Sequence, residues 1–151
     1  MIRTIKKSDF NQYSLLRLEG LKDYQKLTDE KLKLSSKQIK KEFGDFFLSN
    51  KRVMFVVEED KEIKAFIIGT LIKNSYQCIT YIDDIFVREN SRKKGFGKRL
   101  MNEFEKWSKS KKATRIRLGV RVNNKKAIQL YNKIGYQIKH YEMEKKLINR
   151  K

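Results

Sequence analysis

Apolar side chains recur at helical spacing in several stretches of the chain. The clearest stripe consists of Phe96, Leu100, Phe104 and Trp107, which repeat every three or four residues. Ser8 precedes another such stretch and is expected to be its N-cap. The spacing therefore predicts helices over residues 9 to about 24, 36–49, 95–110 and 125–134.

Elsewhere the apolar positions form continuous or alternating runs, which are typical of strands. The strictest alternation places Ile116, Leu118, Val120 and Val122 on one face and arginines on the other. A charged turn at residues 59–62 joins two such runs into a hairpin. The runs predict strands over residues 1–6, 52–59, 63–73, 77–87, 113–122 and 136–147.

The predicted order is β-α-α-β-β-β-α-β-α-β, which indicates a mixed α/β (α+β) fold with a central mixed sheet flanked by helices. Strand 77–87, helix 95–110 and strand 113–122 form a β-α-β unit, so these two strands should be parallel neighbours. The chain has 151 residues, with no repeat, linker or low-complexity boundary. We expect a single domain spanning residues 1–151.

Basic residues exceed acidic ones by 19, and most of the excess lies in the second half of the chain. A field of this sign favours anionic ligands, although a lysine-rich surface can also reflect composition alone. Arg115, Arg117 and Arg121 form a basic stripe, which keeps a nucleic-acid-binding module as an alternative of another class. No nucleic-acid-binding motif accompanies the stripe, so we expect nucleic acid not to be a partner.

Composition also excludes several other classes of protein. No apolar run is long enough to span a bilayer, and the N-terminus lacks the apolar core of a signal peptide. Cys78 is the one cysteine, so no internal disulfide can form, which fits the cytoplasm. His140 is the one histidine, and no Cys/His cluster predicts a metal site. We expect a cytoplasmic protein without a membrane partner or a metal.

Two of the seven glycines stand together in the basic stretch RKKGFGKRL, between a predicted strand and a predicted helix. A helix N-terminus attracts anions, and glycine allows the backbone to approach a phosphate closely. The spacing does not match a P-loop or a dinucleotide fingerprint. The residues alone thus favour a pyrophosphate-binding loop, with a simple helix-start turn as the alternative.

The segment Arg92-Lys93-Lys94-Gly95-Phe96-Gly97 resembles the R/Q-x-x-G-x-G/A loop of the GCN5-related N-acetyltransferases. The strand YIDDIFV and the segment NKKAIQLY, followed by IGY, are also similar to parts of that family. The resemblance is strongest over residues 78–147. The sequence departs from the family at Lys93, where glycine is frequent, and lacks a proline common after the strand.

The resemblance implies acetyl-CoA as a co-substrate. The loop would hold the pyrophosphate through its backbone N–H groups, and the pantetheine arm would pair with the preceding strand. A backbone N–H near Ile85 would polarise the thioester carbonyl. The residues expected to bind the cofactor are Ile85, Phe86, Val87, Arg92, Lys93, Lys94, Gly95, Phe96, Gly97, Lys98, Asn124 and Tyr131.

Two adjacent carboxylates, Asp83 and Asp84, stand in the middle of an apolar strand, where an unpaired charge is costly. They should point to opposite faces unless a bulge intervenes, and each should raise the pKa of the other. By resemblance, Asp83 is our first candidate and Asp84 our second for the base that deprotonates the amine. A structural ion pair or a bulge cap is the alternative for each.

The resemblance further implies that Tyr131 protonates the departing CoA sulfur, and that Asn124 bonds the cofactor or its water. A core aromatic and the N-cap of the helix at 125–134 are the respective alternatives, and the second is compatible with binding. Both residues lie in the NKKAIQLY segment.

The acceptor is expected to be a primary amine. The strand YIDDIFV resembles that of polyamine acetyltransferases, and Asp83, Asp84, Glu58 and Glu59 would form an acidic patch for a cation. A polyamine or an aminoglycoside is therefore favoured, with a protein N-terminus or lysine as the alternative. A CoA-binding regulator without catalysis is less consistent with the aspartates and Tyr131. By analogy, a homodimer is expected.

Overall fold

The computed structural model describes residues 1–147. The chain divides into two compact units, Met1–Gly119 and Val120–Lys151. The first unit holds the whole sheet and three α-helices, and the second holds one α-helix. The expectation of a single domain over the chain stays a prediction.

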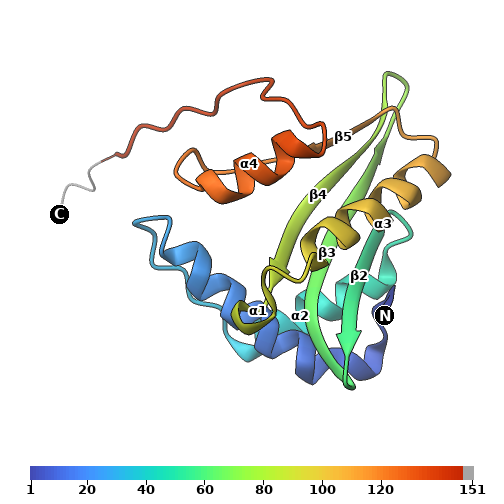
Figure 1. The fold of residues 1–151 in the computed structure, drawn as a ribbon, viewed down its shortest axis with the longest axis vertical. Coiled ribbons are helices and arrows are strands. Elements are labelled where there is room, and N and C mark those ends of the chain that lie inside the picture. The colour runs from blue at the N-terminus through green and yellow to red at the C-terminus, as the bar shows by residue number, and fades with distance from the viewer. Residues whose placement is uncertain (148–151) are drawn as a thin grey trace. The chain divides into compact units, whose positions relative to one another are not determined.

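One five-stranded sheet organises the first unit (Figure 1). Its strands are β1 (Ile2–Thr4), β2 (Arg52–Glu59), β3 (Glu62–Lys73), β4 (Cys78–Val87) and β5 (Arg115–Leu118), and they lie side by side in chain order. All neighbours are antiparallel except β4 and β5, which are parallel as the β-α-β unit requires. The predicted fold class, a mixed sheet flanked by helices, is confirmed.

Helices cover both faces of this sheet (Figure 1). α1 (Phe10–Gln25) and α2 (Ser36–Leu48) lie on one face, and α3 (Phe96–Ser110) crosses the other. α2 begins with a capping box, in which the side chain of Ser35 accepts a bond from the Gln38 amide. None of the helices in residues 1–147 is long and apolar enough to span a bilayer.

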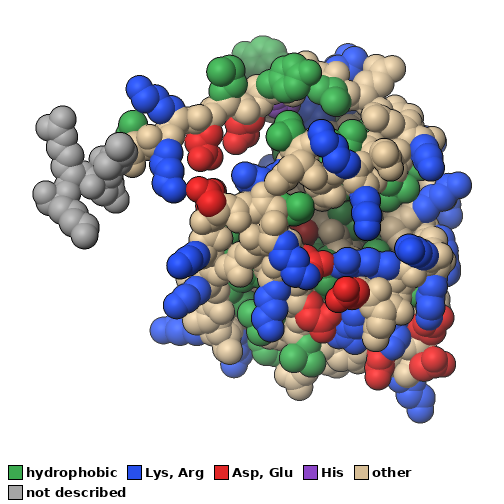
Figure 2. Space-filling model, turned by 60° about the vertical axis from the view of Figure 1, so that its left-hand side comes forward, with side chains coloured by type: hydrophobic (Ala, Val, Ile, Leu, Met, Phe, Trp, Pro, Cys, Tyr) green, Lys and Arg blue, Asp and Glu red, His purple; other side chains and the backbone are tan. Residues whose placement is uncertain are grey.

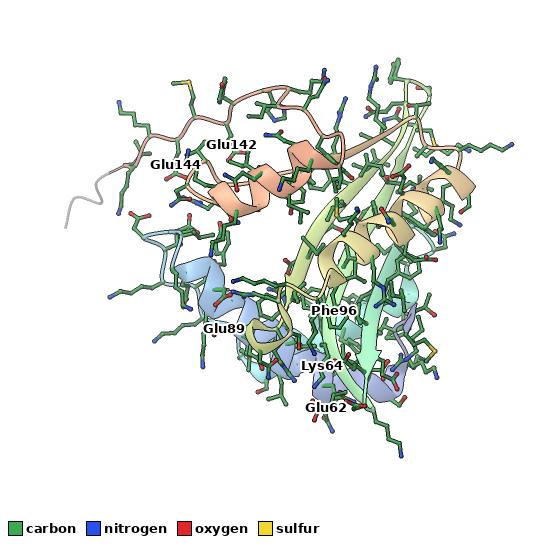
Figure 3. All side chains as sticks on the ribbon, in the orientation of Figure 1. Glu62, Lys64, Glu89, Phe96, Glu142 and Glu144 are labelled. Carbon is green, nitrogen blue, oxygen red and sulfur yellow. The ribbon has the colours of Figure 1, made fainter. Side chains whose placement is uncertain are left out.

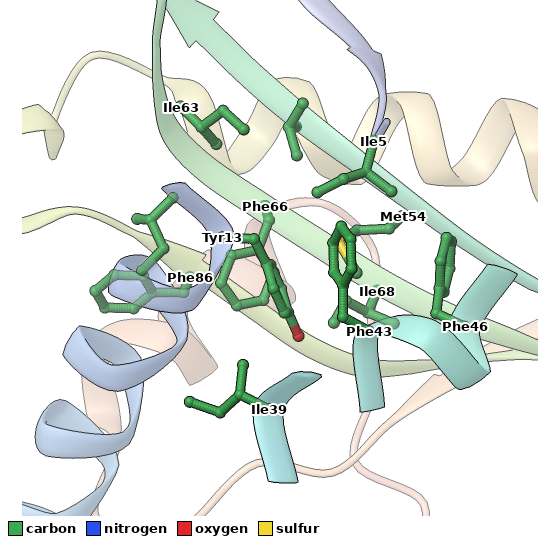
Figure 4. Close-up of a cluster of buried hydrophobic side chains, with 12 residues drawn as sticks. Ile5, Tyr13, Ile39, Phe43, Phe46, Met54, Ile63, Phe66, Ile68 and Phe86 are labelled. Atoms are coloured by element: carbon green, nitrogen blue, oxygen red, sulfur yellow. The ribbon is translucent and has the colours of Figure 1, made fainter. Parts of the chain in front are cut away.

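Aromatic rings fill the space between the sheet and the α1–α2 pair (Figure 4). The Tyr13 ring lies 5.2 Å from the Phe43 ring and 5.6 Å from the Phe66 ring, measured between centroids. Tyr13 and Phe66 are almost fully buried. Burying rings of this size dominates the stability of a core, so these contacts hold α1 and α2 on the sheet.

The opposite face of the sheet packs against α3. Leu100 and Phe104 of the predicted stripe are fully buried there. The hydroxyls of Thr80 on β4 and Ser108 on α3 form a buried 2.7 Å hydrogen bond. This bond shows that Thr80 points toward α3, which fixes the face that β4 presents to that helix.

The sequence prediction for the start of α1 is wrong. Ser8 does not cap α1, because residues Lys7–Asp9 form a short 3₁₀ helix and α1 begins at Phe10. The Asp9 carboxylate instead accepts bonds from Arg3, at 2.7 Å, and from the Lys6 amide, at 2.8 Å. The ion pair with β1 therefore determines where this helix begins.

The predicted strand over residues 136–147 is also wrong, because these residues form neither strand nor helix. β5 ends at Leu118 rather than at residue 122, and α4 (Lys125–Lys133) follows. Alternation of apolar residues predicts which way side chains would point, but a strand also needs a neighbour to pair with. Within residues 1–147, the order of elements thus ends with α4.

Gly69 on β3 is required by the packing of α3. A Cβ atom added at Gly69 would lie 2.0 Å from Cε2 of Phe104 and 2.9 Å from the Tyr81 carbonyl oxygen. Because Phe104 is fully buried and cannot move away, we expect Gly69→Ala to lower the free energy of unfolding by about 1–3 kcal/mol. Urea denaturation of the purified variant measures this change.

Gly44→Ala is the matched control, since a Cβ at this position of α2 meets nothing within 4 Å. Replacing a helical glycine by alanine should raise the free energy of unfolding by up to about 1 kcal/mol. Equal changes in the two variants would contradict the close packing of Phe104 on Gly69.

Candidate functional site

A β-bulge interrupts β4 at the two adjacent aspartates. Ile82 lies opposite Gly69 of β3, and Asp84 lies opposite Ile68, so Asp83 is an extra residue without a partner. A bulge of this kind reverses the side-chain alternation beyond it.

The reversal places both aspartates on the same side of the sheet. Before the bulge, Thr80 points toward α3, where it bonds Ser108. After the bulge, the Phe86 side chain belongs to the core beneath α1 and α2. Asp84 lies two residues before Phe86 on the same strand, so its side chain points to the same face of the sheet. Asp83 accepts a 2.6 Å hydrogen bond from Thr70, which also lies on the α1–α2 side of β3.

The two carboxylates line a cavity of about 350 Å³ between α1, α2 and the sheet. Its charged and polar lining consists of Tyr13, Arg17, Glu42, Arg52, Asp83 and Asp84. All these residues belong to the first unit. The cavity therefore gathers three carboxylates and two guanidinium groups around one space.

Glu58 and Glu59, which we expected to join the aspartates in an acidic patch, do not line this cavity. Glu58 accepts a 2.5 Å bond from Arg3, and Glu59 pairs with Lys94 at 3.1 Å. Glu42 on α2 takes the third acidic position instead. No local motif marks Glu42, so only its place on the cavity side of α2 reveals it.

Arg17 on α1 bridges two of the acidic groups. Its guanidinium lies 3.6 Å from the Asp84 carboxylate and 3.7 Å from that of Glu42. Asp84 keeps 38% of its side-chain exposure through the opening of the cavity. Surrounding protein nevertheless removes enough water to raise the pKa of the Asp84 carboxyl, and the charges of Asp83 and Glu42 add to this rise.

Two groups oppose that rise, namely the Arg17 charge and the backbone N–H of Ile85, which favour the ionised Asp84. The net direction remains upward, which moves this carboxyl toward the range of a general base. Burial also raises the pKa of the Tyr13 hydroxyl to about 12, so that group stays protonated at neutral pH and can donate a hydrogen bond.

The outer edge of β4 is partly unpaired. β5 pairs with β4 only from Ile79 to Ile82, while β4 continues to Val87. On the inner edge, the Arg88 amide donates to Lys64 of β3 at 2.9 Å. Antiparallel strands alternate their bonding direction, so the backbone groups of Ile85 and Val87 point away from β3.

We expected a pantetheine arm to pair with this backbone edge, and that role stays a prediction. The Val87 carbonyl already accepts a 3.0 Å bond from Nε of Arg92. Phe86, between Ile85 and Val87, has a buried side chain, and its backbone groups point toward β3 instead of this edge.

Left-handed backbone shapes the basic loop that follows β4. Lys93 has a φ of 64° and Gly95, the N-cap of α3, a φ of 78°. The family that this loop resembles often has glycine at the position of Lys93. Glycine is favoured there because the backbone is left-handed, a conformation that glycine adopts without steric cost. Phe96, whose side chain is buried, is the first residue of α3 (Figure 3). As in any α-helix, the amides of the first turn have no acceptor within the helix.

Ion pairs hold this loop from outside. Arg92 pairs with Asp23 on α1 and lies over the Phe86 ring, 5.8 Å from its centroid. Lys94 pairs with Glu59 at the end of β2. Arg92 therefore ties the loop to α1 and β4, whereas its predicted contact with phosphate stays a prediction, as do those of Lys93, Lys94 and Lys98.

Asn124 and Tyr131 belong to the second unit. The Asn124 side chain caps α4 by accepting a 3.3 Å bond from the Ala127 amide. Tyr131 lies on α4, with its ring 5.8 Å from that of Tyr136. The N-cap interpretation of Asn124 is thus confirmed, and the roles of both residues toward a cofactor stay predictions.

Several solved structures share this fold. The BH1408 protein of Bacillus halodurans, as a tetramutant, has a TM-score of 0.81 at 21% identity, over 97% of this chain and 99% of that chain. The aminoglycoside N-acetyltransferase AAC(6')-Iy, in complex with a CoA bisubstrate analogue, has a TM-score of 0.76 at 15% identity, over 100% and 97%. AAC(6')-IG from Acinetobacter haemolyticus has a TM-score of 0.75 at 15% identity, over 98% and 99%. At these identities, the likeness shows the fold.

No curated protein sequence matches the chain significantly. The sequence profile of the acetyltransferase (GNAT) family matches residues 18–136, which is most of the chain and includes the bulge, the loop and α4. The predicted enzyme class, an acyltransferase, is thereby confirmed at the level of the family. The chain belongs to the acetyltransferase (GNAT) family.

Proposed function

We propose that this protein transfers an acetyl group from acetyl-CoA to a primary amine bound in the cavity beside Asp84. The observation that carries the proposal is the bulge in β4, which brings two carboxylates into a cavity next to an unpaired strand edge. An amine nucleophile needs a base, and a thioester arm needs a backbone edge. β4 offers both.

The backbone of residues 93–98 binds the pyrophosphate of acetyl-CoA. Two observations support this role, namely the left-handed turn at Lys93 and Gly95 and the free amides of the first turn of α3. A Cβ added at Gly95 meets nothing within 4 Å, so the loop leaves open space where a phosphate fits. The outward backbone of Ile85 and Val87 holds the pantetheine arm.

Asp84 takes the proton from the amine, directly or through water. Its raised pKa and its place in the cavity favour it over Asp83, which is more exposed and bonded to Thr70. The amine nitrogen attacks the thioester carbonyl carbon while a backbone N–H near Ile85 stabilises the oxygen. The C–S bond breaks, and Tyr131 gives its proton to the departing sulfur. Asn124 caps α4 and so positions Tyr131.

The acceptor is a small molecule. A cavity of about 350 Å³ is near the lower end of the range for ligand pockets, which favours a small amine over a protein chain. Polyamines and aminoglycosides are the candidates from sequence, and the AAC(6')-Iy complex contains an acetylneamine analogue. A protein N-terminus or lysine is the alternative, and thiol release with peptide acceptors would test it.

No observation favours the nucleic-acid module. On the face in Figure 2, Lys and Arg side chains are spread widely with Asp and Glu among them, rather than gathered in one stripe. Many basic side chains are already paired, as Arg88 is with Glu19 at 3.2 Å. The homodimer and the cytoplasmic location stay predictions.

The loop can be tested through its backbone strain. Lys93→Gly removes the cost of a left-handed lysine, so it should raise the free energy of unfolding by about 0.5–1 kcal/mol and keep acetyl-CoA binding. Gly95→Ala should lower it by about 1 kcal/mol and weaken binding, because its methyl group occupies the phosphate space. Calorimetric titration with acetyl-CoA and urea denaturation measure both effects.

Lys106→Gly, an exposed position within α3, is the control for adding a glycine and should cost about 1 kcal/mol. Full acetyl-CoA affinity in Gly95→Ala would argue against a phosphate at this loop.

Asp84→Asn should lower kcat by about 10²–10⁴-fold without changing the KM for acetyl-CoA, because the amine loses its base. In the wild type, kcat/KM should fall as the pH drops through the raised pKa of Asp84, since only the ionised carboxylate accepts a proton. Asp84→Asn should lose this fall of kcat/KM at low pH, the acidic limb of the pH profile. Thiol release from acetyl-CoA measures the rates.

Asp83→Asn is the matched control, and it should keep the acidic limb with a smaller loss of kcat. If Asp83→Asn abolished the limb and Asp84→Asn kept it, the base would be Asp83, the first candidate from sequence.

Tyr131→Phe should lower kcat with acetyl-CoA while leaving its binding affinity unchanged, because only the proton donor to sulfur is removed. Tyr136→Phe, the neighbouring ring, is the control and should keep kcat. The two variants are compared by thiol release and by calorimetric titration. Unchanged kcat in Tyr131→Phe would remove this residue from the chemistry.

A further inference from the structure

Among residues 1–147, Arg52 is the one basic residue of the cavity lining that forms no ion pair, and the acidic Asp83 also has none. Arg17 contacts Asp84 and Glu42, and Asp83 accepts a bond from Thr70. None of the ion pairs formed within residues 1–147 includes Arg52. A half-buried guanidinium without a carboxylate partner is a ready site for an anionic ligand group.

Packing holds Arg52 in position on the cavity wall. Its guanidinium carbon lies over the Phe46 ring, 5.8 Å from the ring centroid, within the range of a cation–π interaction. The Arg52 charge also acts on the buried Tyr13 hydroxyl, where it opposes the rise in the pKa of Tyr13. Arg52 and Tyr13 both line the cavity, so a ligand on the Arg52 fork can also accept a hydrogen bond from the Tyr13 hydroxyl.

Strand register fixes the spacing between Arg52 and the base. Arg52 lies opposite Thr70 on β3, two residues from Ile68, and Asp84 lies opposite Ile68 on the other side. Two strand spacings and two residues of rise separate the Cα atoms of Arg52 and Asp84 by about 12 Å. Both side chains reach into the space between, which leaves room for a short molecule.

We propose that the acceptor is a small amine that carries a carboxylate, with the amine at Asp84 and the carboxylate on the Arg52 fork. This inference rests on the proposed acetyltransferase function. An arginine fork binds a carboxylate through two parallel hydrogen bonds, which gives direction as well as affinity. Arg52 is then the residue that selects the acceptor.

At the Arg52 end of the cavity, the unpaired positive charge favours a zwitterion over a diamine, although carboxylates outnumber guanidinium groups in the whole lining by three to two. A diamine would place its second ammonium against Arg52, and like charges at such a site are strongly unfavourable. A neutral amide would leave the guanidinium unpaired inside the cavity. Among small amines, the cavity therefore favours amino-acid-like acceptors. It disfavours the polyamines, which the resemblance of YIDDIFV to polyamine acetyltransferases had favoured.

Matched acceptors test the proposal directly with the full-length protein. Thiol release is measured for α-, β- and γ-amino acids of two to four carbons, each beside its carboxamide and the diamine of equal length. We expect kcat/KM of at least one amino acid to exceed that of its amide by about 10–100-fold, as for a hydrogen bond between charged groups. The kcat/KM of the diamine of equal length should be lower than that of the amide.

Arg52→Gln should raise the KM for that amino acid by about 10–100-fold and leave the kinetics of the amide unchanged. Arg52→Lys, which keeps the charge and loses the fork, should recover part of the loss. Lys51→Gln makes the same change of charge at the exposed neighbouring position and should behave as the wild type. Melting temperatures establish that each variant is folded.

The outcomes separate this inference from the function on which it rests. Turnover of amides or diamines that equals or exceeds that of the amino acids, and that is insensitive to Arg52, would overturn the carboxylate assignment and keep the acetyltransferase. No thiol release with any amine, and no rise in melting temperature with acetyl-CoA, would overturn both.

Discussion

The single extra residue at Asp83 is the constraint on which the site depends. If β4 ran without a bulge, Asp84 would continue the parity of Thr80 and Ile82 and would face α3. That face is closed by the fully buried Phe104, so a carboxylate there would be desolvated without a partner. The bulge turns the carboxylate to the other face, where Arg17 and the cavity receive it.

The same strand then supplies three different surfaces. The inner edge of β4 pairs with β3 along its length, which makes the strand rigid. The outer edge is paired only up to Ile82, which exposes the backbone of Ile85. The end of the strand leads into the left-handed turn at Lys93 and Gly95. The proposed base and backbone edge are therefore held in a fixed arrangement with the proposed phosphate loop, since β4 carries the first two and leads into the third.

The protein has a large excess of basic residues, but several of them form local ion pairs. The loop cations Arg92 and Lys94 are paired with acids of α1 and β2, so they fix backbone instead of adding to a free field. In the cavity, by contrast, Arg52 forms no ion pair with a carboxylate of the described residues and lies over the Phe46 ring. A basic composition alone gave no indication of which arginine faces a ligand.

Local patterns predicted local structure well. Helical spacing located α2 and α3 to within about a residue, and the charged turn identified the β2–β3 hairpin, because these elements form from neighbouring residues. The loop motif and the two aspartates were also recognised from sequence.

What required the structure was pairing between distant segments. The bulge depends on the register of β4 against β3, which the alternation of β4 alone cannot fix. Ser8 lost its capping role to the contact between Asp9 and Arg3, and residues 136–147 lack the neighbour that a strand needs. Glu42 and Arg52 line the cavity because α2 packs on this face of the sheet and β2 lies beyond β3 from β4, an arrangement with no local signal in the sequence.

The titration of the Asp84 side chain tests the central claim most directly. Carbon-detected NMR of the side-chain carboxyl groups, assigned with Asp84→Asn, follows this group through the pH range in the folded protein. A pKa above the ordinary value of 3.8 is predicted, since the bulge places the carboxylate in a desolvated cavity beside two other acids. A pKa at or below that value would contradict the account, because Asp84 would then be a solvated or fully paired carboxylate unsuited to act as the base.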